Sequence, residues 1–532
     1  MKLEPPPNGE VGDLVAWLRA YASERINSAT IDERRCLPPH VVLDFGNRGI
    51  LGMLVEKRYG GLGFGHAQAA TVLEQLGAID GTVCLFVGLN NYLGIRPIAG
   101  YATAAVKDEL LPLLATGREL AAFALTEPGA GSNPRAMLGR AEAVRHGEWR
   151  LYGTKYWIGA AQWAGLMNVF VREGSTFSVG CHLVRQGTPG LRLGAEAPTM
   201  GMRGMIQNTI VLDGVRSLEG ERLGREGEGM SIAQDTMTHG RLAIAAMCIG
   251  AIQRCAQLGL RYASRRQVST GRLLANPTTL EKLGAMTAAV MALRCLVYRL
   301  ANAADAAQQI PVEAFAACKV AAPEFLWRAT DDLMQLLGGR GYTENTPVPQ
   351  MMRDARVLRI FEGPTETMST FLGARLMGSP AGLTKLIGET LKAPHLVPQL
   401  GEVADMVARA AARAQETLGT GSILWGQMRA GKLASWLTLQ AALEGQQSAE
   451  PQPEVARSLL WVKAHLQREL RDLQYGIPEE ATYLDEPALT ALVESFRHRI
   501  GDVVQTLPPM DYTPDPLLST EQATPASSLS SD

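Results

Sequence analysis

One carboxylate, Glu362, stands in a sequence context that suits a general base. It follows an apolar run that ends in Phe361 and precedes Gly363 and Pro364, and a proline favours the first turn of a new helix. A carboxylate on a loop between an apolar run and a helix can be partly desolvated, which raises its pKa toward neutrality. Proton abstraction by Glu362 is therefore one prediction, and helix capping or a salt bridge is the alternative role.

A second segment, residues 123–133 with the sequence FALTEPGAGSN, offers groups that could hold a ligand. A predicted strand leads through Phe123 and Leu125 into Thr126, and small residues then precede Ser132. Such a turn exposes backbone N–H groups and one hydroxyl, so a flat ligand could lie against the main chain. A β-hairpin connection is the alternative interpretation.

A third segment, residues 153–159 with the sequence GTKYWIG, places Trp157 beside Ile158 near the end of a predicted strand. An indole there could pack on an aromatic cofactor, or it could belong to the core. Further along, the glycines of the block 335–368 end a helix and open a loop that leads toward Glu362.

The composition excludes several classes of protein. Of 532 residues, 46% are hydrophobic and 20% are charged, which is typical of a globular chain and excludes disorder throughout. The net charge of −2 argues against nucleic-acid binding. The seven cysteines are scattered without a C-x-x-C pair, so neither a zinc site nor a disulfide framework is expected, and a reducing cytoplasm fits best. We expect no transmembrane segment, because no run of about 18 apolar residues occurs. We also expect no secretory signal, because the N-terminal residues MKLEPPPNGE contain no apolar segment after their single lysine.

The chain changes character along its length, which predicts an α+β multidomain fold. An N-terminal helical domain precedes a central antiparallel β domain, a four-helix bundle that carries Glu362, an extra C-terminal helical domain and a disordered tail rich in Pro, Ser and Thr. The predicted boundaries of these segments are 1–121, 122–235, 236–380, 381–507 and 508–532. No dinucleotide-binding or P-loop glycine motif occurs, so a nucleotide cofactor would have to be held in another way.

Apolar residues spaced three and four apart predict the individual helices. In the N-terminal part these helices cover 11–28, 67–76, 82–95 and 103–115. The same spacing from Leu283 to Leu300 predicts a helix at the seam of the bundle. Residues 455–473 combine Trp461 and several leucines with four basic residues. That helix could lie on a membrane surface as a peripheral contact, or it could pack on the body of the protein with a solvated face.

Several motifs occur in an order that resembles the acyl-CoA dehydrogenase flavoprotein family. They are RYGGLG at 58–63, ALTEPGAGS at 124–132, GTKYWI at 153–158, GMRGM at 201–205, LGREGEGM at 223–230 and IFEGPTE at 360–366. The resemblance covers about residues 10–380, and its specificity lies in the order of the motifs. The C-terminal helices resemble those of extended members that act on very long chains, in which the extra domain lies where a second dimer packs in tetrameric members.

The resemblance implies FAD at the junction of the β domain and the bundle, and it assigns roles to single residues. Glu362 occupies the position of the catalytic base. Positions implied to contact the cofactor are Phe123, Leu125, Thr126, Ser132, Trp157, Ile158, Gly159, Arg266, Gln335, Gly339, Pro364 and Glu366. Among these, Arg266, Gln335 and Gly339 match positions that serve FAD across a subunit interface. Positions implied to contact the substrate are Ser132, Arg241 and Gly363.

The chain departs from the family pattern at positions near the cofactor. Gly159 and Pro364 stand where the family usually has threonine, and Arg266 is followed by QVSTG, which breaks a family motif. Each hydrogen bond lost in this way is worth about 1 kcal/mol. We therefore expect weaker flavin retention than is usual in the family, with partial rescue by Gly159→Thr.

The implied reaction is the α,β-dehydrogenation of an acyl thioester, carried by coenzyme A or by an acyl carrier protein, to the 2-enoyl thioester. Glu362 removes the α-proton while the β-hydrogen leaves as hydride to flavin N5. The implied electron acceptor is a protein such as an electron-transfer flavoprotein, and the implied assembly is a homodimer. Two alternatives remain at this point: a related oxidase that passes electrons to oxygen, and a non-enzymatic assembly or binding member of the fold.

Overall fold

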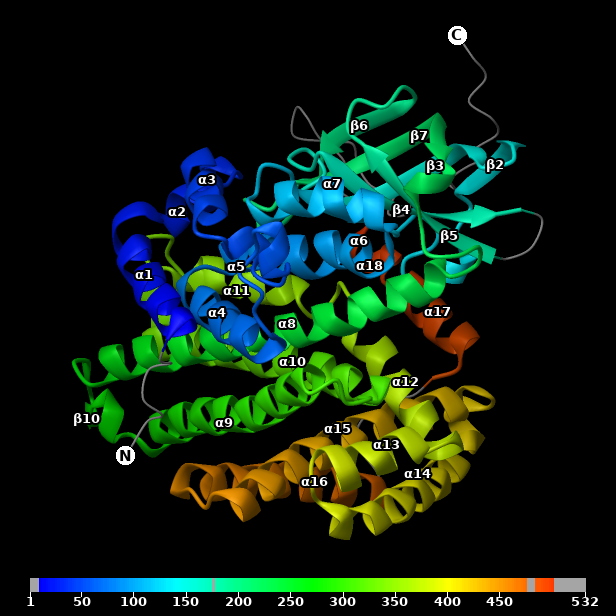
Figure 1. Cartoon of the computed structure of the whole chain (residues 1–532). Coiled ribbons are helices and arrows are strands. Elements are labelled where there is room, and N and C mark those ends of the chain that lie inside the picture. Colours follow the sequence, from blue (N-terminus) through cyan, green and yellow to red (C-terminus); the bar gives the residue numbers. More distant parts are fainter. Residues whose placement is uncertain (1–8, 175–177, 476–483, 502–532) are drawn as a thin grey trace.

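The computed structural model describes residues 9–174, 178–475 and 484–501. Helices, a sheet, a bundle and further helices follow one another along the chain, which confirms the predicted order of domains (Figure 1). The predicted tail, 508–532, and the end of the predicted C-terminal segment lie outside the described residues.

The N-terminal helices pack beside the sheet and across the bundle. Their bounds are α1 Glu10–Arg25, α2 Ser28–Arg34, α3 Pro39–Asn47, α4 His66–Ile79, α5 Gly81–Gly88, α6 Arg96–Tyr101 and α7 Ala104–Ala115. Short 3-10 turns, η1 Ile50–Gly52 and η2 Lys57–Tyr59, lie between α3 and α4. The helix predicted over 82–95 is α5 followed by a π-helical turn, η3 Leu89–Ile95.

The π-helical turn η3 is held by two buried amides. Asn90 Nδ2 donates to Leu51 O at 2.8 Å, and Asn90 Oδ1 accepts from the N–H of Ala121 at 3.1 Å. Asn91 Nδ2 donates to the carbonyl oxygens of Ile50 and Val87, each at 3.0 Å. These bonds tie η3 both to η1 and to the first strand of the sheet, so its side chains have fixed positions between the domains.

The central sheet is mixed, and the prediction of a purely antiparallel domain is wrong in this respect. Its strands run in the order β6-β7-β3-β2-β4-β5-β8, and β1 pairs with β4 in parallel, as does one end of β2. The bounds are β1 Ala121–Ala124, β2 Arg140–Arg145, β3 Glu148–Gly159, β4 Leu166–Glu173, β5 Ser178–Arg185, β6 Leu191–Glu196, β7 Gln207–Leu218 and β8 Arg222–Leu223. The β2–β3 hairpin separates β1 from β4 in sequence, and such a long connection allows two strands to pair in parallel.

The bundle contains the long helices that follow the sheet. Their bounds are α8 Gly229–Ala263, α9 Pro277–Asp305, α10 Val312–Leu337, α11 Val348–Val357 and α12 Thr365–Gly378, and a small hairpin, β9 Gln267–Val268 with β10 Gly271–Arg272, joins α8 to α9. The predicted seam is confirmed, since Leu283, Leu293 and Leu300 are all buried in α9. At the end of α9, Asp305 accepts from the N–H groups of His66 and Ala67, which caps α4.

Two of the described helices, α8 and α9, are long and apolar enough to cross a membrane by length and composition. Within the most apolar stretch of each, 72% of α8 and 44% of α9 is buried inside the protein. Polar residues such as His239 and Arg241 interrupt α8, so this helix contains no continuous run of about 18 apolar residues. A buried core helix passes the same test, so this is weak support for a membrane span.

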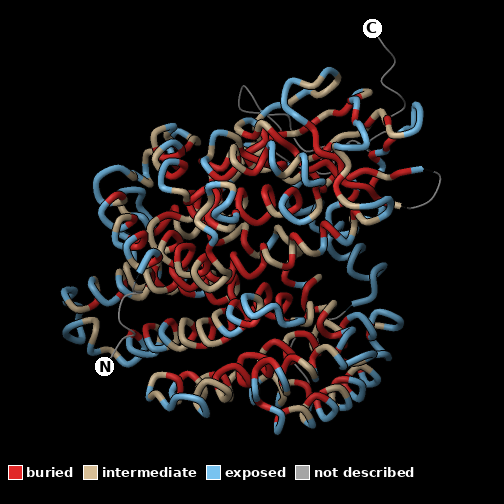
Figure 2. Tube along the Cα trace, viewed as in Figure 1, coloured by how far each residue is buried: buried red, intermediate tan, exposed pale blue. Residues whose placement is uncertain are grey.

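Four C-terminal helices lie on the face of the bundle opposite the sheet: α13 Ala381–Lys385, α14 Val397–Leu418, α15 Gly421–Ala449 and α16 Pro453–Tyr475 (Figure 1). The last two described helices, α17 Glu486–Ser495 and α18 Arg497–Ile500, run back toward the sheet and are red in Figure 1. A continuous cluster of buried apolar side chains extends from the N-terminal helices through the bundle to α16. Figure 2 shows these buried residues where the layers face one another.

The apolar face of α16 packs on the protein itself. Its Trp461 ring lies 5.6 Å from that of Trp436 and 5.4 Å from that of Phe325, measured between ring centroids. Ser458 Oγ donates to Ala288 O of α9 at 2.7 Å. The membrane-surface interpretation of this helix is therefore wrong for most of its apolar face, because that face is already covered by α9, α10 and α15.

Helices α12 and α15 cross at two glycines, which lets their backbones approach closely. A Cβ built at Gly373 would lie 1.7 Å from Gln427 O, and one built at Gly431 would lie 1.7 Å from Ser369 O. No ordinary rotamer change relieves a contact with backbone. Helix α15 thus packs closely against α12, the helix that begins three residues after Glu362.

We expect Gly373→Ala and Gly431→Ala each to lower the free energy of unfolding by about 1–3 kcal/mol, because the added methyl group separates α12 from α15. Gly378→Ala is the matched control on α12, since a Cβ there meets no atom within 4 Å. Thermal unfolding of the three variants measures the effect. Equal melting temperatures for Gly373→Ala and Gly378→Ala would contradict the close crossing.

Candidate active site

The loop between α11 and α12 carries Glu362 in a conformation that few side chains adopt. The backbone φ is +56° at Glu362 and +94° at Gly363. A left-handed residue other than glycine costs about 1–3 kcal/mol and persists only where its surroundings hold it. Glycine at 363 lets the chain continue in this region before Pro364, the N-cap of α12, so the local sequence permits the turn.

Two buried cations from two bundle helices bind the backbone of this loop. Arg241 of α8 donates from Nε to Glu362 O at 3.2 Å. Lys319 of α10 donates from Nζ to Leu358 O at 2.7 Å and to Gly363 O at 3.0 Å. Both cationic side chains are buried, and together they hold the carbonyl groups of the two left-handed residues and that of Leu358.

The carboxyl group of Glu362 has the environment of a general base. Its Oε2 is buried and has no hydrogen-bond partner among the described residues. Burial raises the pKa of Glu362, while the charges of Arg241 and Lys319 act in the opposite direction. Burial also lowers the pKa of Lys319 to about 8. A carboxylate with a pKa raised toward the working pH is well matched to proton abstraction.

The turn η3 brings the sheet and the Glu362 loop to one place. A Cβ built at Gly159, the end of β3, would lie 2.7 Å from Leu89 Cδ1 and 3.1 Å from Met205 Cε. Leu93 lies four residues after Leu89 in η3 and faces α8. A Cβ built at Gly240 of α8 would lie 3.2 Å from Leu93 Cδ2 and 3.9 Å from Glu362 Oε2. The segment around Trp157 and the Glu362 carboxylate therefore lie on either side of the same turn.

On the sheet side, a buried ion pair holds the loop that follows β1. Lys155 Nζ contacts Glu127 Oε1 at 2.7 Å and donates to Phe170 O at 2.5 Å. The Glu127 carboxylate in turn accepts from the N–H groups of Leu138 and Gly139. This loop does not join two antiparallel partners, so the β-hairpin interpretation is wrong. It connects β1 to β2, which both pair with β4, and the Glu127 carboxylate near its start binds the N–H groups at its end.

The groups predicted to meet a flat cofactor lie at this edge with part of their surface open. Trp157 is 58% exposed on a strand whose neighbour Ile158 is buried, and it has a left-handed φ of +55°. Thr126 O accepts from Tyr156 N–H at 2.9 Å, which joins the loop to β3, and Ser132 is exposed in the same loop. Leu125 is buried beneath it. An open indole beside a loop with free hydroxyls fits the ring system of FAD.

The positions expected to serve a neighbouring subunit lie elsewhere. Arg266, Gln335 and Gly339 are exposed at the ends of α8 and α10, and these helices run in the same direction. From Arg241 to the last residue of α8 the helix rises by roughly 33 Å. Within one chain these three residues therefore cannot meet the site at Glu362. Glu366 is exposed on the first turn of α12, and Phe123 packs on Phe170 with ring centroids 4.8 Å apart.

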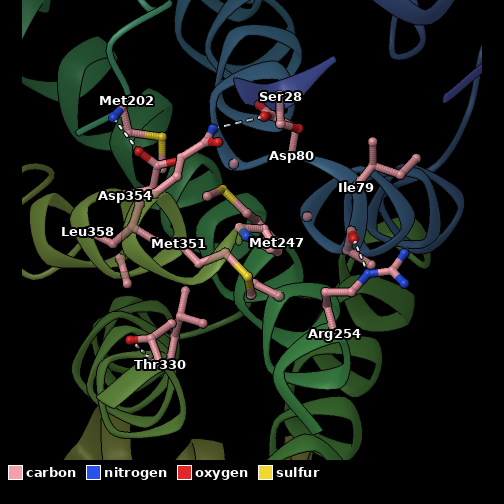
Figure 3. A pocket seen from close by; sticks show the side chains of 18 of the residues that line it. Ser28, Ile79, Asp80, Met202, Met247, Arg254, Thr330, Met351, Asp354 and Leu358 are labelled. Atoms are coloured by element: carbon pink, nitrogen blue, oxygen red, sulfur yellow. Dashed lines mark hydrogen bonds between the residues drawn. The ribbon is translucent and has the colours of Figure 1, made fainter. Parts of the chain in front are cut away.

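Two cavities lie along α8 on either side of Arg241. One of about 210 Å³ is bordered by Met247, by Leu358 and, at one end, by Asp80 and Asp354 (Figure 3). Burial raises the pKa of Asp354 to about 8. The other, of about 500 Å³, is more polar and has His66, Arg96, Asp235, His239 and Phe315 in its wall.

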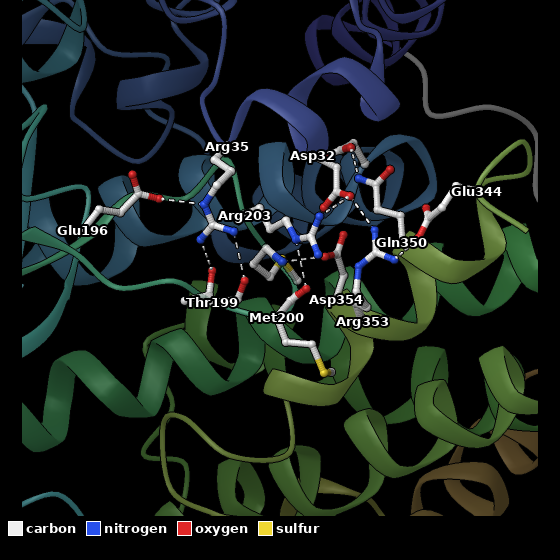
Figure 4. Close-up of polar contacts among 12 residues, drawn as sticks. Asp32, Arg35, Glu196, Thr199, Met200, Arg203, Glu344, Gln350, Arg353 and Asp354 are labelled. Carbon is white, nitrogen blue, oxygen red and sulfur yellow. Dashed lines mark hydrogen bonds and ion pairs between the residues drawn. The ribbon is translucent and has the colours of Figure 1, made fainter. Parts of the chain in front are cut away.

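A polar junction fixes α11, the helix that leads to the Glu362 loop (Figure 4). Arg353 of α11 pairs with Asp32 of α2 and, at 2.7 Å, with Glu344. Arg203, from the segment between β6 and β7, reaches Asp32 at 3.4 Å. Next to Arg353, Asp354 Oδ1 accepts from Met202 N–H at 2.5 Å. The Asp32 carboxylate, through Arg203 and Arg353, thus joins the N-terminal helices, the sheet domain and the bundle.

Sequence reasoning missed the charged residues that position the site. Lys319 and Lys155 are each a lysine among mainly apolar residues, a context that indicates a buried and paired cation. Glu127 lies inside the ALTEPGAGS motif, and in the structure it closes the loop. Leu89 carried no signal, because only the fold shows that it fills the space beside Gly159.

Gly159→Thr is expected to destabilise the protein, because its Cβ would press on Leu89. Overpacking typically costs about 1–3 kcal/mol. Rescue of flavin retention therefore needs the double variant Gly159→Thr with Leu89→Ala, in which the threonine takes the vacated space. Calorimetry of both variants, with Leu89→Ala alone as control, measures this. A single variant as stable as the parent would show that Leu89 moves aside freely.

Comparison with known proteins agrees with this arrangement. Three family models match in chain order: the acyl-CoA dehydrogenase N-terminal domain over 10–118, the middle domain over 122–215 and the C-terminal domain over 227–377. An acyl-CoA dehydrogenase of Bacillus subtilis is 30% identical over 368 residues, which are 68% of this chain and 96% of that protein. The very long-chain specific acyl-CoA dehydrogenase of Rattus norvegicus is 29% identical over 70% of this chain and 58% of its own length.

Solved structures show the same fold. Butyryl-CoA dehydrogenase from Megasphaera elsdenii has a TM-score of 0.67 and 26% identity, covering 70% of this chain and all of that one. An acyl-CoA dehydrogenase complexed with FAD from Bacillus anthracis has a TM-score of 0.73 at 22% identity. That fold likeness covers 93% of this chain and 92% of the other, so it includes the C-terminal helices. With three domains matched in order around the Glu362 loop, the chain belongs to the acyl-CoA dehydrogenase family of FAD-dependent oxidoreductases.

Proposed function

We propose that the protein dehydrogenates an acyl thioester at its α and β carbons, with Glu362 as the base that removes the α-proton. The observation that carries this proposal is the buried, unpartnered Oε2 of Glu362 on a loop held by Arg241 and Lys319. A carboxylate held in this way has no internal hydrogen bond to lose when it accepts a proton. The product is the 2-enoyl thioester, and the proton lost from the α-carbon resides on Glu362.

FAD would lie between Trp157 and the Glu362 loop, against Thr126 and the exposed loop that ends near Ser132. Bound FAD supplies the acceptor for the β-hydrogen, which leaves the substrate with its electron pair. In this proposal the chain aligns the cofactor side with the base side of the substrate, since η3 contacts β3 on one side and α8 on the other. We propose an electron-transferring flavoprotein as the protein that reoxidises the cofactor, on the strength of family membership.

The two cavities along α8 support an orientation for the substrate. A thioester has a polar carrier arm on one side of its carbonyl and an apolar tail on the other. The polar cavity with Arg96 and His239 precedes Arg241 on α8, and the cavity with Met247 follows it. We therefore place the carrier arm toward residues 231–239 and the tail toward residues 247–258. Both coenzyme A and the pantetheine arm of an acyl carrier protein share this polarity.

Glu362→Gln should retain FAD but reduce it at least about a hundredfold more slowly under saturating thioester, because the amide cannot accept the α-proton. Anaerobic stopped-flow bleaching with thioesters of several chain lengths and both carriers measures the rate. Glu281→Gln, an exposed position on α9, is the control. Bleaching by Glu362→Gln at nearly the parental rate would remove Glu362 from this role, and loss of activity in Glu366→Gln instead would transfer the role to that residue.

We further propose a homodimer in which Arg266, Gln335 and Gly339 contact the FAD of the other subunit. Their separation from Glu362 within one chain supports this arrangement, and the C-terminal helices α13–α16 cover the bundle where a second dimer could otherwise pack.

Light scattering is expected to give the mass of two chains. Arg266→Ala should raise the FAD dissociation constant roughly tenfold, since a charge-assisted contact is lost. Its neighbour Arg265→Ala, also exposed, should leave FAD binding unchanged. A stable tetramer would contradict the role given to the C-terminal helices, and equal FAD affinity in the two arginine variants would contradict the shared site.

A further inference from the structure

Lys319 has no exposed surface, yet it carries an ammonium group into the centre of the bundle. An unpaired buried charge is strongly unfavourable, so a lysine persists in such a place only where its hydrogen bonds are well satisfied. Its partners are backbone carbonyls: Leu358 O at 2.7 Å and Gly363 O at 3.0 Å. These two residues bracket the loop that carries Glu362.

The same helix holds the loop at a second point, with the opposite charge. Glu324 of α10 accepts from Arg359 Nε at 2.6 Å and from Thr365 Oγ1 at 2.8 Å, and both donors belong to the two ends of the loop. Helix α10 therefore clamps the loop through one cation and one anion. Of these two side chains, the cation of Lys319 lowers the pKa of Glu362.

We propose that Lys319 is a positioning residue, which holds the Glu362 loop in its left-handed conformation and stabilises the Glu362 carboxylate through its positive charge. This inference rests on the proposed role of Glu362 as the base. Lys319 touches neither the reacting atoms nor the cofactor in this proposal; it acts only through the loop and the electric field at Glu362.

The charged groups around the base determine the direction of the effect. Glu362 is faced by Arg241 from α8 and by Lys319 from α10, and both lower its pKa against the rise caused by burial. Lys319 is itself influenced by Glu362, Cys248, Arg241 and Glu324. Without the ammonium group, the pKa of Glu362 rises further. The ionised base is then lost at a higher pH as the solution is acidified.

The experiment compares Lys319→Met and Lys319→Gln with the parental holoenzyme by anaerobic stopped-flow reduction of bound FAD across pH 5–9. Methionine removes the charge and both hydrogen bonds, whereas glutamine removes the charge but keeps a donor. In both variants the acid limb of the rate profile should move to higher pH, and the rate at pH 7 should fall at least about tenfold. The fall should be larger for methionine, because the loop is then also released.

Glu324→Gln is the matched control, since it loosens the same loop from the same helix without removing a positive charge. Its rate can fall, but its acid limb should stay at the parental pH. FAD content and melting temperature are measured for every variant. A Lys319→Met profile that superimposes on the parental one would overturn the proposal, and so would an equal displacement of the acid limb in Glu324→Gln.

If neither Lys319 variant retains FAD, Lys319 supports the bundle as a whole and the specific positioning role is rejected. Failure of the proposed function is a separate result, because the parental enzyme would then show no bleaching with any thioester. Reduction that is normal in Glu362→Gln would also reject the proposed function before the Lys319 variants are compared.

Discussion

The proposed chemistry depends on a carboxylate that must be desolvated and still ionise. Burial alone would keep Glu362 protonated, and full pairing with a cation would leave it unreactive. The chain meets both demands by directing Arg241 and Lys319 to backbone carbonyls of the loop, so that their charges act on Glu362 without bonding its Oε2. This arrangement requires α8 and α10 to lie side by side, and it requires α11 to enter the loop at a fixed angle.

The sheet uses the same kind of buried lysine with a different outcome. Lys155 is paired directly with Glu127, and both groups are saturated by the backbone around them. Such a fully paired group is suited to fixing a loop, here the one that presents Thr126 and Ser132. Within the described part of the chain, Lys319 bonds to carbonyls and to no carboxylate, so its charge remains available to act on Glu362. Two lysines of equal burial thus serve a structural and an electrostatic role because their partners differ.

The departure at Gly159 is explained by the space around it. A missing threonine leaves no empty volume at the end of β3, because Leu89 of the π-helical turn occupies it. The turn also places Leu93 against Gly240, and its two asparagines fix it to η1 and β1. Small residues on the sheet and on α8 are therefore matched to leucines of η3, and a substitution at one of these positions must be judged together with its partner.

The sequence by itself determined the order of domains and most helices, and it indicated Glu362 as the candidate base, because apolar spacing and short ordered motifs are local properties of a chain. It also located the loop at 125–133, although it could not tell a hairpin from a crossing loop, since parallel pairing of β1 with β4 depends on residues far apart in sequence. Only the tertiary structure decided that the sheet is mixed, that α16 is covered by the bundle, and that Lys319 reaches the Glu362 loop across 43 residues of chain. Each of these depends on which surfaces meet after folding, and the strength of a buried charge depends on partners that no local pattern specifies.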